Sequence, residues 1–240
     1  MGIFDIFFGG ESGQLKRHTR RVADRDAQPE DREASASWLY DKGTDEALIG
    51  LCARFNLQLE HSMKDQKEKD YVADLLVEKG APAGKAARAV ARTSPNFQYP
   101  VRIVERIDGP GAGVDLLLEL LKTETVHDEW KPEKKRTLLI TLAERKDPRI
   151  IDAATPFLAD FDEGVRHAAI EAMAIQDGDA ARSGLLTAFV NPKEESTRVR
   201  GRLAEIFAQK RWSVPEDDAW LASHVPQGYR LDNGRVVASR

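Results

Sequence analysis

Residues 147–176 read DPRIIDAATPFLADFDEGVRHAAIEAMAIQ, and this stretch decides the fold. Apolar residues recur at spacings of three and four on both sides of a short polar break, as in two amphipathic helices that each bury one face. Asp147 and Pro148 suit the start of the first helix, and the acidic residues within 160–163 suit the start of the second, because free N–H groups there favour carboxylates. The stretch therefore predicts a helix, a tight turn and a second helix.

The second half of this stretch also carries a family pattern. Leu158-x-Asp160-x-Asp162-Glu163-x-Val165-Arg166, followed by Ala169 and Ala172, resembles the HEAT repeat, in particular the variety found in phycobilisome-lyase-like bacterial proteins. The valine–arginine pair returns 34 residues later, an interval that matches such a repeat. The resemblance implies an all-α fold, an α-α superhelix or HEAT-repeat solenoid. It also implies a structural role between repeats for Asp160, Val165, Arg166, Val199 and Arg200.

Self-similarity extends the pattern to about six helical hairpins. Gly43, Gly80 and Gly109 stand where first helices should end. After Trp212 the repeat fades, and Asp-Asn-Gly at 232–234 between short apolar runs predicts a small C-terminal β-hairpin. We divide the chain into an apolar and basic N-terminal segment (1–26), a HEAT-repeat array (27–212) and a C-terminal cap (213–240).

Composition indicates a charge-rich helical protein. The net charge of −4 argues against a protein built to coat nucleic acid. No run approaches the roughly 18 apolar residues of a membrane span, and the opening MGIFDIFF lacks the basic region of a signal peptide. A single cysteine, Cys52, excludes a disulfide within the chain. We therefore expect a cytoplasmic protein, and the family resemblance implies a bacterial one.

Residue types that carry chemistry are scattered along the chain. The five histidines lie in separate parts of the chain, and none follows another at the i, i+4 spacing of a helical metal site. The sequence contains neither a Gly-rich phosphate loop nor a Gly-x-Ser-x-Gly elbow. The sequence thus predicts no catalytic residue, no metal site and no cofactor, and we expect that the protein is not an enzyme.

The resemblance favours a non-enzymatic scaffold that binds another protein in a concave groove, because most HEAT arrays bind proteins. Two alternatives stay open. One is a HEAT-like DNA-repair glycosylase or other nucleic-acid binder, although that family's catalytic residues do not map onto this chain and we expect no nucleic-acid partner. The other is a lyase-like accessory protein for cofactor attachment, which rests on fold analogy.

Two charged stripes supply candidate partner-binding residues. Lys85, Arg88 and Arg92 lie at spacings of three and four on one predicted helix, and Asp115 and Glu119 form an acidic stripe in the next hairpin. In HEAT proteins the second helix of each hairpin usually lines the concave face. Either the stripes neutralise each other between adjacent helices, or they orient a partner segment that carries both charges.

The N-terminal segment supplies a second set of candidates. Residues 3–8, IFDIFF, hold five large apolar groups, including Phe4, Phe7 and Phe8, and a basic stretch follows at 14–24. We favour the interpretation that these phenylalanines cap the first repeat, since terminal repeats need a cover. Docking to a partner and, behind it, peripheral contact with a membrane are the alternatives.

Overall fold

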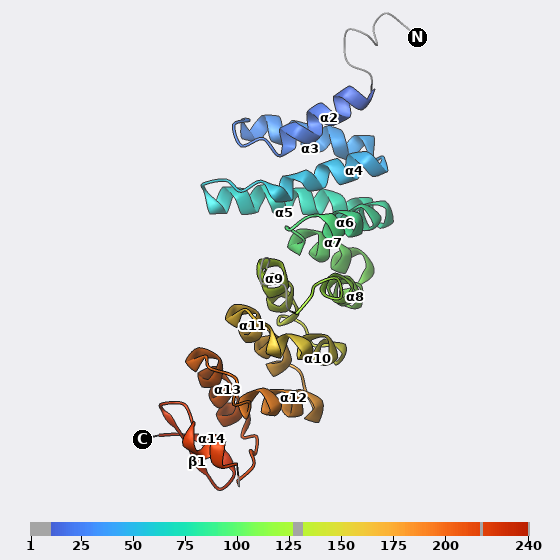
Figure 1. Ribbon diagram of the computed structural model, residues 1–240. Coiled ribbons are helices and arrows are strands. Elements are labelled where there is room, and N and C mark those ends of the chain that lie inside the picture. Colours follow the sequence, from blue (N-terminus) through green and yellow to red (C-terminus); the bar gives the residue numbers. More distant parts are fainter. Residues whose placement is uncertain (1–10, 127–131, 217, 240) are drawn as a thin grey trace, which may run out of the picture. The chain divides into compact units, whose positions relative to one another are not determined.

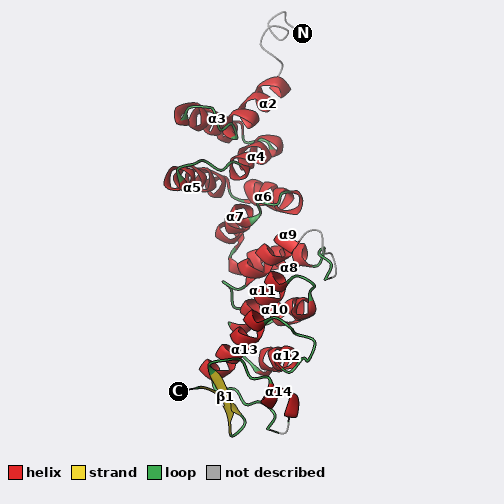
Figure 2. Cartoon of the chain, turned by 60° about the vertical axis from the view of Figure 1, so that its left-hand side comes forward, coloured by secondary structure: helices red, strands yellow, loops and turns green. Residues whose placement is uncertain are grey.

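The computed structural model describes residues 11–126, 132–216 and 218–239, and helices make up most of it (Figures 1 and 2). The chain divides into two compact units, Met1–Leu116 and Leu117–Arg240. The predicted contacts of Phe4, Phe7 and Phe8 lie outside the described residues. The fold class predicted from the sequence, an all-α protein of paired helices with a short C-terminal hairpin, is confirmed.

The first unit is built from helices in two layers. Helix α3 contacts α5, and α5 contacts α7, whereas α4 contacts α6. The first helices of successive hairpins therefore form one layer and the second helices form the other. Helix α2 packs against α3 and α4 and covers the start of this stack. The elements are α2 (Glu11–Val22), α3 (Pro29–Lys42), α4 (Asp45–Leu51), the 3₁₀ helix η1 (Cys52–Asn56), α5 (Ser62–Lys79), α6 (Ala81–Thr93) and α7 (Gln98–Asp108), and α8 (Pro110–Leu121) runs across the division between the units.

Local sequence sets the turns of this unit. Gly43 ends α3 in the left-handed region, with φ of 61°, and Thr44 caps α4 by accepting the N–H of Ala47 at 3.3 Å. Gly50 has a different role, because a Cβ at this position would collide with the side chain of Thr19. The glycine therefore permits the close approach of α2 and α4.

The second unit repeats the two-layer arrangement. Helices α9, α11 and α13 contact one another in order, and α10 contacts α12 in the other layer. The elements are α9 (Pro132–Leu142), α10 (Arg149–Ala154), the 3₁₀ helix η2 (Thr155–Ala159), α11 (Glu163–Ala174), α12 (Asp179–Phe189), α13 (Thr197–Lys210) and α14 (Ala219–Ser223), followed by strands β1 (Tyr229–Asp232) and β2 (Arg235–Ala238).

The two strands form the predicted hairpin. They pair antiparallel, with Tyr229 opposite Ala238 and Asp232 opposite Arg235. The turn residues Asn233 and Gly234 both have positive φ, 48° and 67°, as a type I′ turn requires. The β2 strand packs on α13, so the hairpin covers the end of the last helix of this unit.

The stretch that decides the fold forms its two helices as predicted, and Val165 is one of the buried residues of the second, α11. Its side chain is completely buried, and its N–H donates to the capping carboxylate of Asp162 at 2.9 Å. We expect Val165→Ala to lower the free energy of unfolding by about 1–3 kcal/mol, through lost burial and a cavity. Chemical denaturation measures this, and an unchanged midpoint would contradict the placement of α11.

Candidate functional site

Ion pairs join consecutive hairpins of the second unit at an equivalent position. The fourth residue of α9, Lys135, pairs with Asp160 at 2.7 Å, and the fourth residue of α11, Arg166, forms a bidentate pair with Glu194 at 2.7 and 2.9 Å. Asp160 and Glu194 both stand just before the next first helix. Arg166 also donates to the backbone carbonyl of Asp160 at 3.0 Å, although the charged partners of these two side chains are Glu194 and Lys135.

Arg200 is the fourth residue of α13, the position that Lys135 and Arg166 hold in α9 and α11, but its guanidinium contacts an aromatic ring. Its guanidinium lies over the ring of Trp220, with 4.7 Å to the ring centroid, and burial lowers its pKa against the opposing effect of Glu194. Within the described chain, its buried Nε and Nη2 have no hydrogen-bond partner. The neighbouring Val199 is buried and is held by the Ser196 cap. Aromatic stacking thus replaces the next acidic residue at the end of the array.

The basic stripe predicted on α6 is already engaged within the protein. Lys85 pairs with Asp45, and Arg88 pairs with Asp108 at 2.8 Å. Arg92 takes part in interactions within the chain as well, and so do the acidic candidates Asp115 and Glu119. Recruitment of a partner by the stripe stays a prediction, and it requires these internal contacts to be exchanged.

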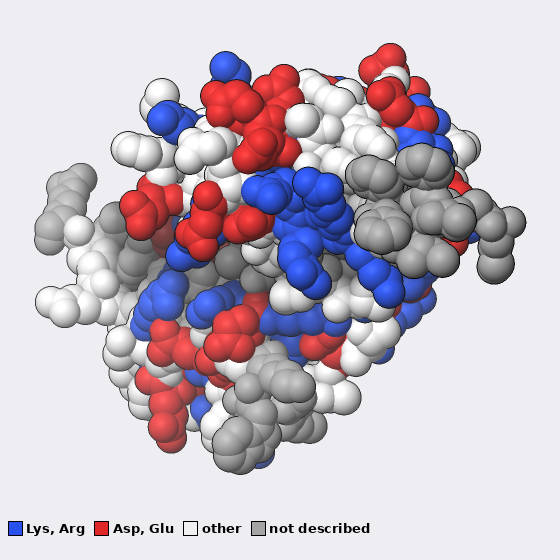
Figure 3. Space-filling model, turned by 90° about the horizontal axis from the view of Figure 1, so that it is seen from above, with Lys and Arg blue, Asp and Glu red and all other residues white. Residues whose placement is uncertain are grey.

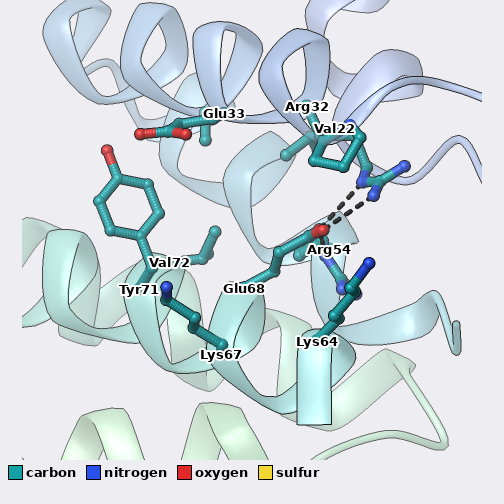
Figure 4. Close-up of a pocket in the computed structure, with 11 residues that line it drawn as sticks. Val22, Arg32, Glu33, Arg54, Lys64, Lys67, Glu68, Tyr71 and Val72 are labelled. Carbon is teal, nitrogen blue, oxygen red and sulfur yellow. Dashed lines mark hydrogen bonds and ion pairs between the residues drawn. The ribbon is translucent and has the colours of Figure 1, made fainter. Parts of the chain in front are cut away.

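A pocket of about 380 Å³ lies between the first helices of two successive hairpins, α3 and α5 (Figure 4). Its wall combines apolar side chains with four cationic and two acidic ones. Figure 4 shows Glu33 and Tyr71 at one end, and Arg32, Arg54 and Glu68 at the other. The lining residues are Val22, Pro29, Arg32, Glu33, Ala36, Arg54, Lys64, Lys67, Glu68, Tyr71 and Val72.

Glu68 organises the charged end of this pocket. Arg32 binds its carboxylate in bidentate geometry, at 2.8 and 2.9 Å, and Arg54 donates to the same carboxylate at 3.1 Å. Arg54 also pairs with Asp65 at 2.8 Å, and Lys69 pairs with that aspartate at 2.6 Å. These bonds join α3, η1 and α5, so the pocket has a rigid polar floor.

The charges of this network change the acidity of its carboxylates. Burial by itself would raise the pKa of Glu68, but the hydrogen bond from Arg32 and the charges of both arginines outweigh it and lower the pKa. The pKa of Asp65 is lowered in the same way, because Lys69 and Arg54 outweigh burial. Both carboxylates are therefore ionised at neutral pH, and they neutralise the cations of the floor.

The cations on the rim are different. Lys64 and Lys67 are exposed on α5, and neither has an ion-pair partner in the described part of the chain. Met63 is 85% exposed, and Met63, Lys67 and Tyr71 follow one another at spacings of four along one helix face. Lys67 and Tyr71 border both the pocket and a shallow depression on the other side of α5. This face of α5 offers an apolar methionine and two lysines that are available to a partner.

Sequence reasoning missed this surface because both lysines lie in an ordinary charged run, MKDQKEKD at 63–70. The one available signal was the spacing of Met63, Lys67 and Tyr71, which places a large apolar group and an aromatic ring on the same face as a lysine. The pocket itself forms where α3 contacts α5. The periodicity of each helix does not predict that contact.

Three further observations concern metal ligands, the cysteine thiol and membrane spans. Over residues 11–126, 132–216 and 218–239, no three His, Cys, Asp or Glu side chains are grouped to hold a metal ion. Burial raises the pKa of the Cys52 thiol to about 12, which keeps it protonated and unreactive at neutral pH. In the same residues, no helix combines the length and apolar character needed to cross a membrane.

In a comparison with known families, residues 114–206 match HEAT repeats. Comparisons with curated proteins and with solved structures gave no match. The predicted bacterial, phycobilisome-lyase-like variety stays a prediction, because the match describes HEAT repeats alone. The matched residues include α9 to α12 and most of α13, whose two-layer packing and repeated ion pairs agree with such repeats. Together these findings support a HEAT-repeat protein.

Proposed function

We propose that this chain is a non-enzymatic scaffold that binds an acidic, partly apolar segment of another protein between α3 and α5. HEAT repeats commonly serve as protein-interaction scaffolds, which supports the general class. The observation that carries the proposal is the pairing of an apolar-walled pocket with Lys64 and Lys67, two exposed lysines without ion-pair partners in the described chain.

The chemistry of the pocket selects this class of partner. Val22, Ala36 and Val72, each 1–2% exposed, close the base of the pocket, and Pro29 and Tyr71 give it an exposed apolar wall for one large side chain. The arginines of the floor are neutralised by Glu68 and Asp65, so the excess positive charge lies on the rim. Carboxylates that flank the apolar anchor would therefore meet lysines, whereas a basic segment would be repelled.

A peptide selection tests this proposal. Random peptides displayed on phage would be selected on the full-length protein, and we expect enriched sequences to carry a large apolar residue beside Asp or Glu. A selected peptide should bind Lys64→Glu/Lys67→Glu at least about tenfold more weakly than wild type, because two attractive contacts become repulsive. Fluorescence anisotropy gives both dissociation constants.

A matched variant tests whether the loss of binding depends on where the lysines lie or only on the net charge of the protein. Lys122→Glu/Lys193→Glu changes the net charge equally at two exposed lysines outside the pocket lining, and it should bind the peptide as wild type does. Enriched peptides without acidic residues, or equal loss of binding in both double variants, would contradict the proposal.

A further inference from the structure

Glu33 is an acidic residue of the pocket that the protein leaves without a charged partner. It is exposed on α3, and within residues 11–126, 132–216 and 218–239 no cation pairs with its carboxylate. Glu68, the other carboxylate of the lining, is held by two arginines. Figure 3, viewed onto the end that carries α2, shows acidic and basic side chains mostly next to one another across that face. Glu33 thus offers a carboxylate that a partner's cation can bind.

The ring of Tyr71 lies near this carboxylate. Figure 4 shows both side chains at the same end of the pocket. Tyr71 is 38% exposed, and its hydroxyl lies 3.5 Å from that of Ser37 on α3. The ring therefore reaches across from α5 to α3, next to Glu33.

Two other tyrosines in the layer of first helices each have a cation over the ring. Lys79 lies 3.8 Å from the centroid of the Tyr40 ring, and Arg102 lies 5.2 Å from the centroid of the Tyr99 ring. In the described part of the chain, no cation lies over the ring of Tyr71. Because the face of an aromatic ring attracts cations, Tyr71 has a ring surface that an outside cation can use.

The surroundings of Tyr99 show how a carboxylate and an arginine share one tyrosine. Its hydroxyl donates to Asp70 at 3.1 Å, while Arg102 lies over its ring. At the pocket, Tyr71 has the carboxylate of Glu33 nearby, but the chain supplies no arginine among its described residues. The arginine of this arrangement is therefore left for a partner to supply.

We propose that the partner segment bound in this pocket carries an arginine that stacks on Tyr71 and pairs with Glu33. The inference rests on the proposed function, and it adds one arginine to the apolar anchor and the acids of the segment. Arginine fits better than lysine, because its planar guanidinium can stack on a ring while its N–H groups bind a carboxylate. A lysine ammonium is a point charge without this planar surface.

The positions of the charges also set the spacing within the segment. Lys64 and Tyr71 are seven residues apart on α5, which is about 10 Å at roughly 1.5 Å per residue. An extended segment covers that distance with about three residues. An acid that meets Lys64 and the arginine at Tyr71 should therefore be about three positions apart. A further acid at Lys67 would reduce the repulsion between that lysine and the arginine.

Substituted peptides test this inference. In an acidic peptide selected on the wild-type protein, the positions around the apolar anchor would be replaced one at a time by arginine, lysine or alanine. At one of them we expect arginine to bind at least about threefold more tightly than alanine, because an ion pair and a ring contact are gained. Lysine at that position should bind less tightly than arginine. Fluorescence anisotropy gives the dissociation constant of each peptide.

Protein variants identify the residues that recognise the arginine. Glu33→Gln should remove most of the advantage of arginine over alanine, and Tyr71→Leu should reduce the advantage of arginine over lysine. Asp41→Asn is the matched control, since it removes one charge from an exposed residue of α3 outside the pocket lining. It should leave both advantages unchanged. Circular dichroism confirms that each variant is folded.

The double variant Lys64→Glu/Lys67→Glu distinguishes failure of this inference from failure of the proposed function. It should weaken the binding of every peptide while arginine keeps its advantage over alanine. If it leaves peptide binding undiminished, the proposed function fails and this inference fails with it. If it weakens binding as expected, but arginine gives no advantage at any position or keeps its full advantage on Glu33→Gln, this inference alone is overturned.

Discussion

Replacing Lys135 with methionine is expected to lower the free energy of unfolding by about 3–5 kcal/mol. The Lys135 ammonium lies 2.7 Å from the Asp160 carboxylate, and both side chains are almost fully buried, with exposures of 1% and 0%. Methionine would leave this carboxylate in the interior without its cation, and the cost of burying an unpaired charge far exceeds that of losing an exposed pair. Urea denaturation followed by circular dichroism gives the free energy.

Two controls separate the buried charge from the loss of a lysine. Lys146 also pairs with an aspartate, Asp177 at 3.0 Å, but these side chains are 68% and 81% exposed, so Lys146→Met should cost at most about 1 kcal/mol. The double variant Lys135→Met/Asp160→Asn removes both charges and keeps an oxygen for the N–H of Asp162. It should recover much of the loss. Equal costs for Lys135→Met and Lys146→Met would contradict this account.

Glu68→Ala, in the first unit, is expected to lower the free energy of unfolding by a similar amount, about 3–5 kcal/mol. The substitution removes the carboxylate that binds Arg32 in bidentate geometry and Arg54 through Nε, and these guanidinium groups are 5% and 1% exposed. Hydrogen exchange should show loss of protection in α3 and α5. Glu78→Ala on the exposed face of α5 is the control, with an expected change within about 0.5 kcal/mol.

The same carboxylate predicts how stability depends on pH. The pKa of Glu68 in the folded protein lies below its ordinary value of 4.5. Its ionised form therefore stabilises the fold above pH 4.5, and this contribution is lost as the pH falls below that value toward the folded pKa. Glu68→Gln should reduce the acid-induced loss of stability. An identical pH profile in wild type and Glu68→Gln would contradict the assignment.

Local sequence signals predicted the helices and turns of this fold because they depend on residues close together in the chain. The Gly43–Thr44 turn, the Asp162 cap and the Asn233–Gly234 hairpin are examples. Each is fixed by backbone conformation or by a side chain within three residues, which periodicity and capping rules describe well.

The charged contacts were harder to predict, because their partners come from other hairpins. Lys135 and Asp160 are 25 residues apart, and Arg166 and Glu194 are 28 apart. A stripe on one helix does not reveal which neighbour it meets: one of the two interpretations placed Arg88 opposite the acids of α8, and the structure pairs it with Asp108 at the end of α7.

The pocket between α3 and α5 was missed for the same reason. In the sequence, Lys64 and Lys67 resemble any solvated lysines, and only the packing of two first helices gives them an apolar wall and a neutralised floor. The surroundings of Lys64 and Lys67 therefore follow from tertiary structure, while the helix that carries them follows from the sequence.

The most direct test is a crystal structure of the full-length protein with its tightest selected peptide. The account predicts an apolar peptide side chain against Pro29 and Tyr71, with a peptide carboxylate within about 4 Å of the Nζ atom of Lys64 or Lys67. A peptide that instead lies along α6 against Lys85 and Arg88, with the pocket empty, would contradict it.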